Sequence, residues 1–206
     1  MTDTNPDLAT RSAPDFAVAR KAMIDSQLRT SGVNAEYVLA RMNQVAREDF
    51  VPEDQKALAY IDRSLPLGEG RAIPSPVVHG MMLREAAPQA TDSALVVENG
   101  SGYLAELLGP LVKGVDTIDA ADAAQSAIKG SGYSLIIVDG ALEGLSKGLE
   151  KCLAEGGRIV TGIAERGVTR LASGKKIAGQ TTLQPIADIG IPVLHDFDQP
   201  KRWSFA

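Results

Sequence analysis

The pattern of apolar and polar positions divides the chain into a helical first part and a second part in which strands and helices alternate. Apolar residues recur at roughly helical spacing over residues 14–31 and again over residues 35–45, which predicts two amphipathic helices. Residues 59–76 instead contain Pro, Gly and short apolar runs, which favour an irregular segment or a small hairpin. Loops of this length often carry function.

From residue 93 onward, short apolar runs alternate with helical segments. The expected strands cover residues 94–97, 114–119, 133–138 and 158–163, and the expected helices cover 103–111, 120–129 and 142–153. This alternation implies right-handed crossovers and a mostly parallel sheet that is covered on both faces. Two further β-rich runs, at 168–173 and 176–184, are separated by a turn expected at Ser173-Gly174. They predict antiparallel strands that complete a sheet of six or seven strands.

Composition adds the expected domain organisation. With 206 residues, 44% hydrophobic and 23% charged, the chain is long enough to bury one substantial core. We expect residues 1–12 to form a disordered arm, because they are rich in Asp, Thr, Asn and Pro. Residues 13–206 are expected to form one domain, with a helical cap and loop at 13–92 and a doubly wound core at 93–206.

Charge and the rare residues argue against several classes of protein. The net charge is −5 and no stripe of Lys and Arg runs along any segment, so we expect no nucleic-acid partner. No apolar leader and no membrane-length apolar run is visible, which predicts a cytoplasmic protein without a membrane partner. The lone Cys152 predicts no internal disulfide, and isolated His79 and His195 predict structural histidines and no metal site.

One constellation of residues suggests chemistry: a glycine turn that joins an apolar strand to a helix. Gly100, Ser101 and Gly102 form this turn, and Asp119 follows about 20 residues later, at the end of the next strand. Such a turn lets the backbone approach a ligand, and a carboxylate at the second position can bind ribose hydroxyls. The motif also fits a dinucleotide site, and the turn alone has a purely geometric explanation. Asp119 could likewise be a solvated residue at a strand end.

Six segments together carry a family resemblance. They read ARKAMIDSQLRTSGV (19–33), VLARMNQVAREDFVP (38–52), LAYIDRSLPLGEGRAI (58–73), GSGY (100–103), YSLIIVDGA (133–141) and LAEGGRIV (153–160). In this order they resemble the signature segments of protein-L-isoaspartate O-methyltransferases. The resemblance implies a Rossmann-like, S-adenosylmethionine-dependent methyltransferase fold. It also implies esterification of isoaspartyl carboxylates in a protein or peptide substrate.

The resemblance also implies site residues, although it assigns no catalytic residue. The expected S-adenosylmethionine contacts are Glu98, Asn99, Gly100, Ser101, Gly102 and Asp119. The expected substrate contacts are Ile73, Ser75 and Asp139. The sequence leaves the oligomeric state open, a homodimer included.

Three departures from the family pattern bear on this expectation. A gapless alignment places Val96 on the family's acid and Glu98 on its first glycine, whereas a tighter loop would place Glu98 on the acid itself. The 13 residues between Asp119 and Tyr133 suffice for one helix only, so a strand unit of the family pattern is missing and residues 114–119 become the sheet edge. The resemblance implies that this unit carries an acidic contact to adenine in the family. At two positions where the family has hydroxyl side chains, this chain has Ala72 and Pro74.

These observations leave three hypotheses. The first is a working methyltransferase of this family. The second is a pseudoenzyme that keeps the fold as a binding module, with weak or absent affinity for S-adenosylmethionine. The third is a nicotinamide-dependent oxidoreductase, which is supported by the glycine turn alone.

Overall fold

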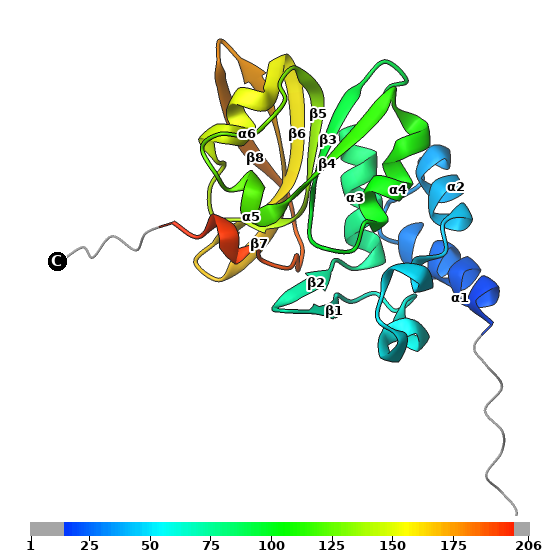
Figure 1. Ribbon diagram of the computed structural model, residues 1–206. Coiled ribbons are helices and arrows are strands. Elements are labelled where there is room, and N and C mark those ends of the chain that lie inside the picture. The colour runs from blue at the N-terminus through cyan, green and yellow to red at the C-terminus, as the bar shows by residue number, and fades with distance from the viewer. Residues whose placement is uncertain (1–14, 200–206) are drawn as a thin grey trace, which may run out of the picture.

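A six-stranded sheet forms the centre of the computed structural model, which describes residues 15–199 (Figure 1). The strand order is β4-β3-β5-β6-β7-β8. The strands are β3 (Ser93–Glu98), β4 (Gly114–Asp119), β5 (Tyr133–Leu142), β6 (Leu153–Glu165), β7 (Val168–Ile177) and β8 (Gln180–Asp188). The first four strands of this order are parallel, and β7 and β8 continue the sheet antiparallel. The predicted mostly parallel sheet with an antiparallel end is therefore confirmed. The arm predicted for residues 1–12 lies outside the described residues.

Helices cover both faces of this sheet (Figure 1). Alternate strand residues point to opposite faces, so Val96 and Ile137 contribute to one hydrophobic cluster while Leu95 and Ile136 contribute to another. The first cluster lies beneath α1 (Phe16–Met23), α2 (Glu36–Gln44), α3 (Pro76–Ala86) and α4 (Tyr103–Leu108). The second lies beneath the shorter α5 (Ala120–Ala123) and α6 (Lys147–Cys152).

The amino-terminal elements agree with their predictions. Asp15 caps α1 by accepting hydrogen bonds from two backbone N–H groups of the first turn, and the helix continues as a π-helical turn over Ile24–Leu28. Within residues 59–76, β1 (Leu65–Gly68) and β2 (Arg71–Ile73) form the expected small antiparallel hairpin. The hairpin leads directly into α3, so it lies next to the carboxyl ends of the central strands (Figure 1).

The edge of the sheet also agrees with its prediction. β4 pairs with β3, and β5 returns to the other side of β3. No strand forms within residues 120–132, all of which the structure describes. The missing strand unit therefore leaves β4 as an edge strand, as the short connection predicted.

Three local predictions were wrong. The helix expected at 120–129 is limited to Ala120–Ala123, because the chain then leaves the helical path and Gln125 and Ile128 pack closely on Gly148 of α6. The helix expected at 142–153 covers only Lys147–Cys152, since β5 extends to Leu142 and is held there by a bridge from Ala141 to Val193.

The third wrong prediction concerns the turn in the antiparallel part. β7 runs straight through Ser173 and Gly174, and the chain turns instead at Ala178 and Gly179, whose φ angles are 52° and 78°. A Cβ at Gly174 would lie 2.7 Å from the carbonyl oxygen of Thr182. This glycine therefore permits close approach of two strands rather than a turn.

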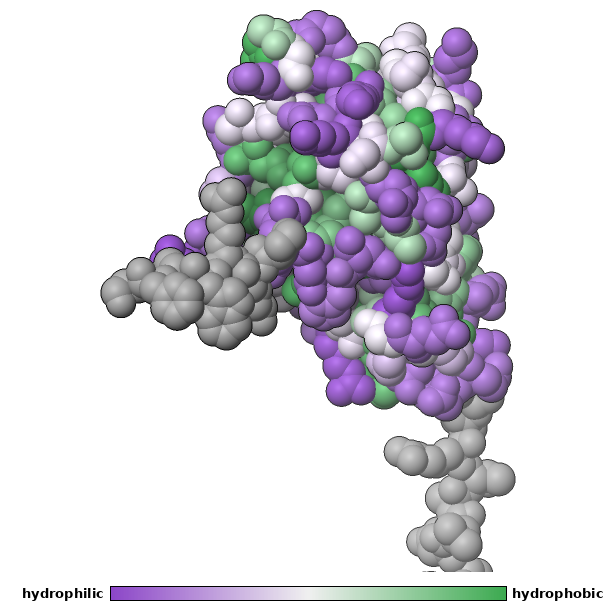
Figure 2. Space-filling model, turned by 60° about the vertical axis from the view of Figure 1, so that its left-hand side comes forward, coloured by the Kyte–Doolittle hydropathy of each residue, from purple (hydrophilic) through white to green (hydrophobic). Residues whose placement is uncertain are grey.

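The face shown in Figure 2 carries many hydrophilic side chains. Figure 2 shows hydrophobic atoms in hollows between hydrophilic side chains on the face that it presents. No helix among residues 15–199 combines the length and the apolar character needed to cross a bilayer.

Candidate functional site

The predicted glycine turn lies at the carboxyl end of β3 and leads into α4. Gly100 and Gly102 have φ angles of 90° and 73°, in the left-handed region that favours glycine. The Ser101 hydroxyl accepts a hydrogen bond from the Tyr103 N–H at 3.2 Å. The backbone thus has the form expected of a ligand-binding turn, and the turn predicted at Gly100–Gly102 is confirmed.

Glu98 folds back into this turn. Its Oε2 accepts the Gly102 N–H at 2.9 Å, while Oε1 is buried and has no hydrogen-bond partner among the described residues. Burial raises the pKa of the Glu98 carboxyl to about 7, and nearby Asp139 raises this pKa further, whereas the Gly102 N–H opposes the rise. A carboxyl group of the chain itself therefore uses a backbone amide that the turn could otherwise offer to a ligand.

Asp139 belongs to a buried polar chain on β5. Its Oδ1 lies 2.8 Å from Nε2 of His79, and Nδ1 of His79 lies 3.1 Å from Nη1 of Arg47. Because guanidinium groups only donate, Nδ1 accepts and Nε2 carries the proton that is donated to Asp139. Burial lowers the pKa of His79, so the ring is neutral at physiological pH. Asp139 also accepts a long hydrogen bond from the Ser101 hydroxyl at 3.5 Å.

Arg47 fixes this chain to the segment that precedes α3. Its side chain is fully buried and donates to the carbonyl oxygens of Ala59 and Pro74. It also lies over the ring of Tyr103, with 5.0 Å from the guanidinium carbon to the ring centroid. His79 is thus buried and hydrogen-bonded at both ring nitrogens, and its structural role stays a prediction. Arg47 was not among the residues predicted from the sequence, because no local sequence pattern marks it.

Asp119 is already engaged at the end of β4. Its Oδ1 accepts the Ala121 N–H at 2.9 Å, which caps α5, and accepts Nη2 of Arg71 at 3.1 Å. Arg71 also lies 3.7 Å from the carboxylate of Asp196. The carboxylate predicted to bind ribose is thus part of a partly exposed charged cluster, and its role toward a ligand stays a prediction.

The residues predicted to bind substrate are largely enclosed. Ile73 is buried at the end of β2 and Asp139 is buried in β5. The Ser75 hydroxyl caps α3 by accepting the Val78 N–H at 3.4 Å. Ser75 also lines a hollow of about 660 Å³, together with Ala72 and residues 189–192. The structure brings Ser101 and Asp139 together beside the turn, whereas Ile73 and Ser75 belong to the neighbouring segment.

A segment near the end of the described chain covers the carboxyl ends of the strands. Ala141 exchanges backbone hydrogen bonds with Pro192 and Leu194. Leu194 packs so closely on Gly140 that a Cβ there would lie 2.6 Å from its Cγ. The cavity left beside the turn has a volume of about 340 Å³. Its lining residues are Glu69, Gly70, Arg71, Asn99, Val193, Leu194, His195 and Asp196.

Two buried polar atoms at this cavity lack partners among the described residues. They are Nη1 of Arg71 and Oδ1 of Asn99, whose amide nitrogen donates to the carbonyl oxygen of Ala72. In residues 15–199 no group of His, Cys, Asp and Glu has an arrangement that could hold a metal ion. The cavity is therefore small and polar, and its lining combines acidic and basic groups.

Sequence comparisons agree with this architecture. A profile of the protein-L-isoaspartate(D-aspartate) O-methyltransferase family matches residues 18–121. A relative from Petrotoga mobilis, named protein-L-isoaspartate O-methyltransferase, is 32% identical over 185 residues, which cover 88% of this chain and 86% of the relative. A relative of the same name from Roseiflexus is 39% identical over 128 residues, covering 60% of this chain and 58% of the relative.

A solved structure shares the fold. It is a putative protein-L-isoaspartate O-methyltransferase from Plasmodium falciparum in complex with S-adenosyl-L-homocysteine, with a TM-score of 0.70 and 18% sequence identity. The similarity covers 88% of this chain and 99% of that protein. The sheet, its glycine turn and its two helical layers thus define a Rossmann-like fold of the methyltransferase class. By sequence, the chain belongs to the protein-L-isoaspartate(D-aspartate) O-methyltransferase family.

Proposed function

We propose that this chain is a non-catalytic member of the family, which keeps the methyltransferase fold as a binding module and binds S-adenosylmethionine weakly or not at all. The observation that carries this proposal is the position of Glu98. Its carboxyl group occupies the glycine turn and takes the Gly102 N–H. The residues present therefore do not fit the family's cofactor.

Charge and hydrogen bonding at the turn both oppose binding of the family's cofactor. S-adenosylmethionine carries a carboxylate on its methionine part, and an ionised Glu98 at the turn would repel that group. The second predicted contact, Asp119, is paired with Arg71 and caps α5. Each charge-assisted hydrogen bond is worth on the order of 1.5–3 kcal/mol, so two lost bonds would weaken binding about a hundredfold or more.

The open edge supports the same proposal. In the family, the strand unit that follows the second strand carries an acidic contact to adenine, and residues 120–132 form no strand here. Methyl transfer to a carboxylate needs no strong base, because the nucleophile is already ionised at neutral pH. Catalysis therefore depends on alignment and on exclusion of water, which lost positioning groups would impair.

A second candidate is slow methyl transfer from S-adenosylmethionine to a protein carboxylate. The unpartnered atoms Nη1 of Arg71 and Oδ1 of Asn99 favour it, because both belong to residues that line a cavity beside an intact glycine turn. The raised pKa of Glu98 favours it too, since a neutral carboxyl would not repel the cofactor. The nicotinamide alternative keeps only the glycine turn in its favour.

Transfer of a labelled methyl group from S-adenosylmethionine to an isoaspartyl peptide separates the two candidates. We expect no methyl transfer by the unmodified chain. In Glu98→Gly we expect partial recovery of cofactor binding, measured by calorimetric titration. Glu98→Gln is the matched control, because it removes the charge but keeps an acceptor for the Gly102 N–H. Robust transfer by the unmodified chain that is lost in Glu98→Gly would show that Glu98 is a ligand and would overturn the proposal.

A further inference from the structure

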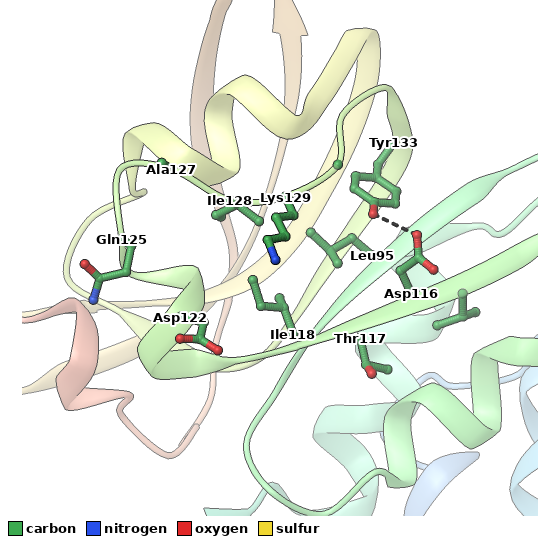
Figure 3. A pocket seen from close by; sticks show the side chains of 12 residues that line it. Leu95, Asp116, Thr117, Ile118, Asp122, Gln125, Ala127, Ile128, Lys129 and Tyr133 are labelled. Atoms are coloured by element: carbon green, nitrogen blue, oxygen red, sulfur yellow. Dashed lines mark hydrogen bonds between the residues drawn. The ribbon is translucent and has the colours of Figure 1, made fainter.

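A second hollow lies away from the glycine turn, beneath the free edge of β4. Its volume is about 930 Å³, and its walls are β4 and residues 125–130 (Figure 3). Leu95, Ile118 and Ile128 point toward one another across its floor (Figure 3). Leu95 and Tyr133 belong to the amino-terminal halves of β3 and β5, whereas the glycine turn lies at the carboxyl ends. The hollow is therefore distinct from the candidate site.

The edge above this hollow offers unpaired backbone groups. Within the described residues, β4 forms ladder pairs with β3 only, so the N–H and C=O groups on its other side have no strand partner. Parallel sheets are normally covered on both faces, and an exposed edge is a template for another extended segment. An extended segment could therefore bind at the place beside β4 where a further strand would lie.

The charges around the hollow restrict which segment fits. Asp116 and Asp122 line it, and Lys129 is the one cationic side chain among its described lining residues. Tyr133 donates a hydrogen bond to Asp116 at 2.8 Å, shown as a dashed line in Figure 3, so Asp122 is the acid without such a tyrosine partner. A second copy of β4 would bring like charges together at this edge. A basic segment with apolar side chains would match both the charge and the floor.

Residues 200–206 have this chemistry. They read Pro-Lys-Arg-Trp-Ser-Phe-Ala and thus combine two basic and two aromatic residues. By contrast, residues 1–14 contain Asp3 and Asp7 and precede α1, which packs on the opposite face of the sheet. Among the chain's own segments outside the described range, residues 200–206 are therefore the better match.

The described chain ends within reach of the hollow. The Gln199 N–H donates to Glu143 at 2.7 Å, and the helical turn His195–Phe197 contacts α5, whose Asp122 lines the hollow. Seven extended residues span about 23–25 Å. We propose that residues 200–206 bind in the hollow beside β4, with Lys201 and Arg202 toward its acids and Trp203 on its apolar floor.

Tryptophan fluorescence tests this proposal on the full chain, because Trp203 is the only tryptophan. We expect native emission at a shorter wavelength than in the urea-unfolded chain and a several-fold smaller quenching constant with acrylamide. Ile118→Asp and Asp122→Lys should each return emission and quenching toward the unfolded values. Ile177→Asp is the matched control, since Ile177 is 66% exposed on β7 and lies outside the hollow.

A charge exchange removes ambiguity about folding. Asp122 is exposed, so Asp122→Lys should leave the far-UV circular dichroism unchanged even if Ile118→Asp disturbs the fold. Combining Asp122→Lys with Arg202→Glu should restore the shielding of Trp203. Emission equal to that of the unfolded chain would overturn the proposal. So would shielding that is indifferent to both hollow substitutions, or shielding that appears only as the chain dimerises at higher concentration.

Discussion

The carboxyl end of β3 and the free edge of β4 differ in how completely the protein's own residues fill them. At the carboxyl end, Glu98 occupies the turn, and the Arg47–His79–Asp139 chain connects three distant parts of the protein. At the edge, the shortened connection leaves a hollow and an unpaired strand side. At the first place a single side chain of the protein fills the turn, whereas at the second a volume remains that only another segment can fill.

The largest expected effect comes from replacing Arg47, which holds the buried polar chain at the carboxyl end of β3. Arg47→Leu leaves two carbonyl oxygens and His79 without a donor, and this should lower the free energy of unfolding by about 3–5 kcal/mol. Urea denaturation measures the change. Lys21→Ala is the control, because its ion pair with Asp25 is exposed and should contribute under about 1 kcal/mol. Equal losses in both variants would contradict the comparison.

Glu98 should make the free energy of unfolding depend on pH in a characteristic way. Its folded-state pKa of about 7 lies above the ordinary value of 4.5, so the folded chain binds more protons between these values. Its contribution to stability is therefore fully present below about pH 4.5 and is lost as pH rises through 7. Glu98→Gln should be more stable than the unmodified chain by about 1–3 kcal/mol at pH 8 and nearly unchanged at pH 4.5. A difference between the two chains that does not vary with pH would contradict this account of Glu98.

Two glycines separate backbone strain from packing at the turn. A Cβ at either Gly102 or Gly109 meets no atom within 4 Å, but Gly102 has a φ of 73° whereas Gly109 has a φ of −45°. Gly102→Ala should destabilise the fold by about 1–2 kcal/mol, and Gly109→Ala should be neutral or slightly stabilising. Thermal unfolding of the pair checks this, and equal effects would show that the turn is not strained.

The smallest effect is expected at the open edge. Tyr133→Phe removes the hydrogen bond to Asp116, which lies partly exposed, and should cost about 0.5–1.5 kcal/mol. Urea denaturation is again the measurement, with Tyr133→Leu as a larger truncation for scale. A loss of unfolding free energy as large as that of Arg47→Leu would mean that the edge at β4 is as tightly constrained as the carboxyl end of β3.

The sequence predicted the parts of the fold that depend on local pattern. Apolar runs located the strands, and the short connection after Asp119 identified β4 as the edge. The turn at Ala178 and Gly179 was missed because alanine seldom adopts a positive φ. The helix that became α6 was predicted too long. Val193 bridges to Ala141 and extends β5, and no local sequence pattern shows a contact between residues so far apart in the chain.

The site was predicted less completely than the fold. Gly100, Gly102 and Asp119 were placed correctly from their positions between strands and helices. The bonds of Glu98 to Gly102 and of Asp119 to Arg71 were not predicted, because they depend on side-chain direction. Arg47, His79 and Asp139 are 32 and 60 residues apart, so only the folded chain brings them together.

Calorimetric titration of the unmodified chain with S-adenosylhomocysteine tests the central claim most directly. This ligand carries the same carboxylate, ribose and adenine as the cofactor, so it probes the turn without requiring turnover. We expect no heat of binding at micromolar ligand, because Glu98 and Arg71 occupy the groups that would hold it. Micromolar binding with one site per chain would contradict the claim that the turn is filled.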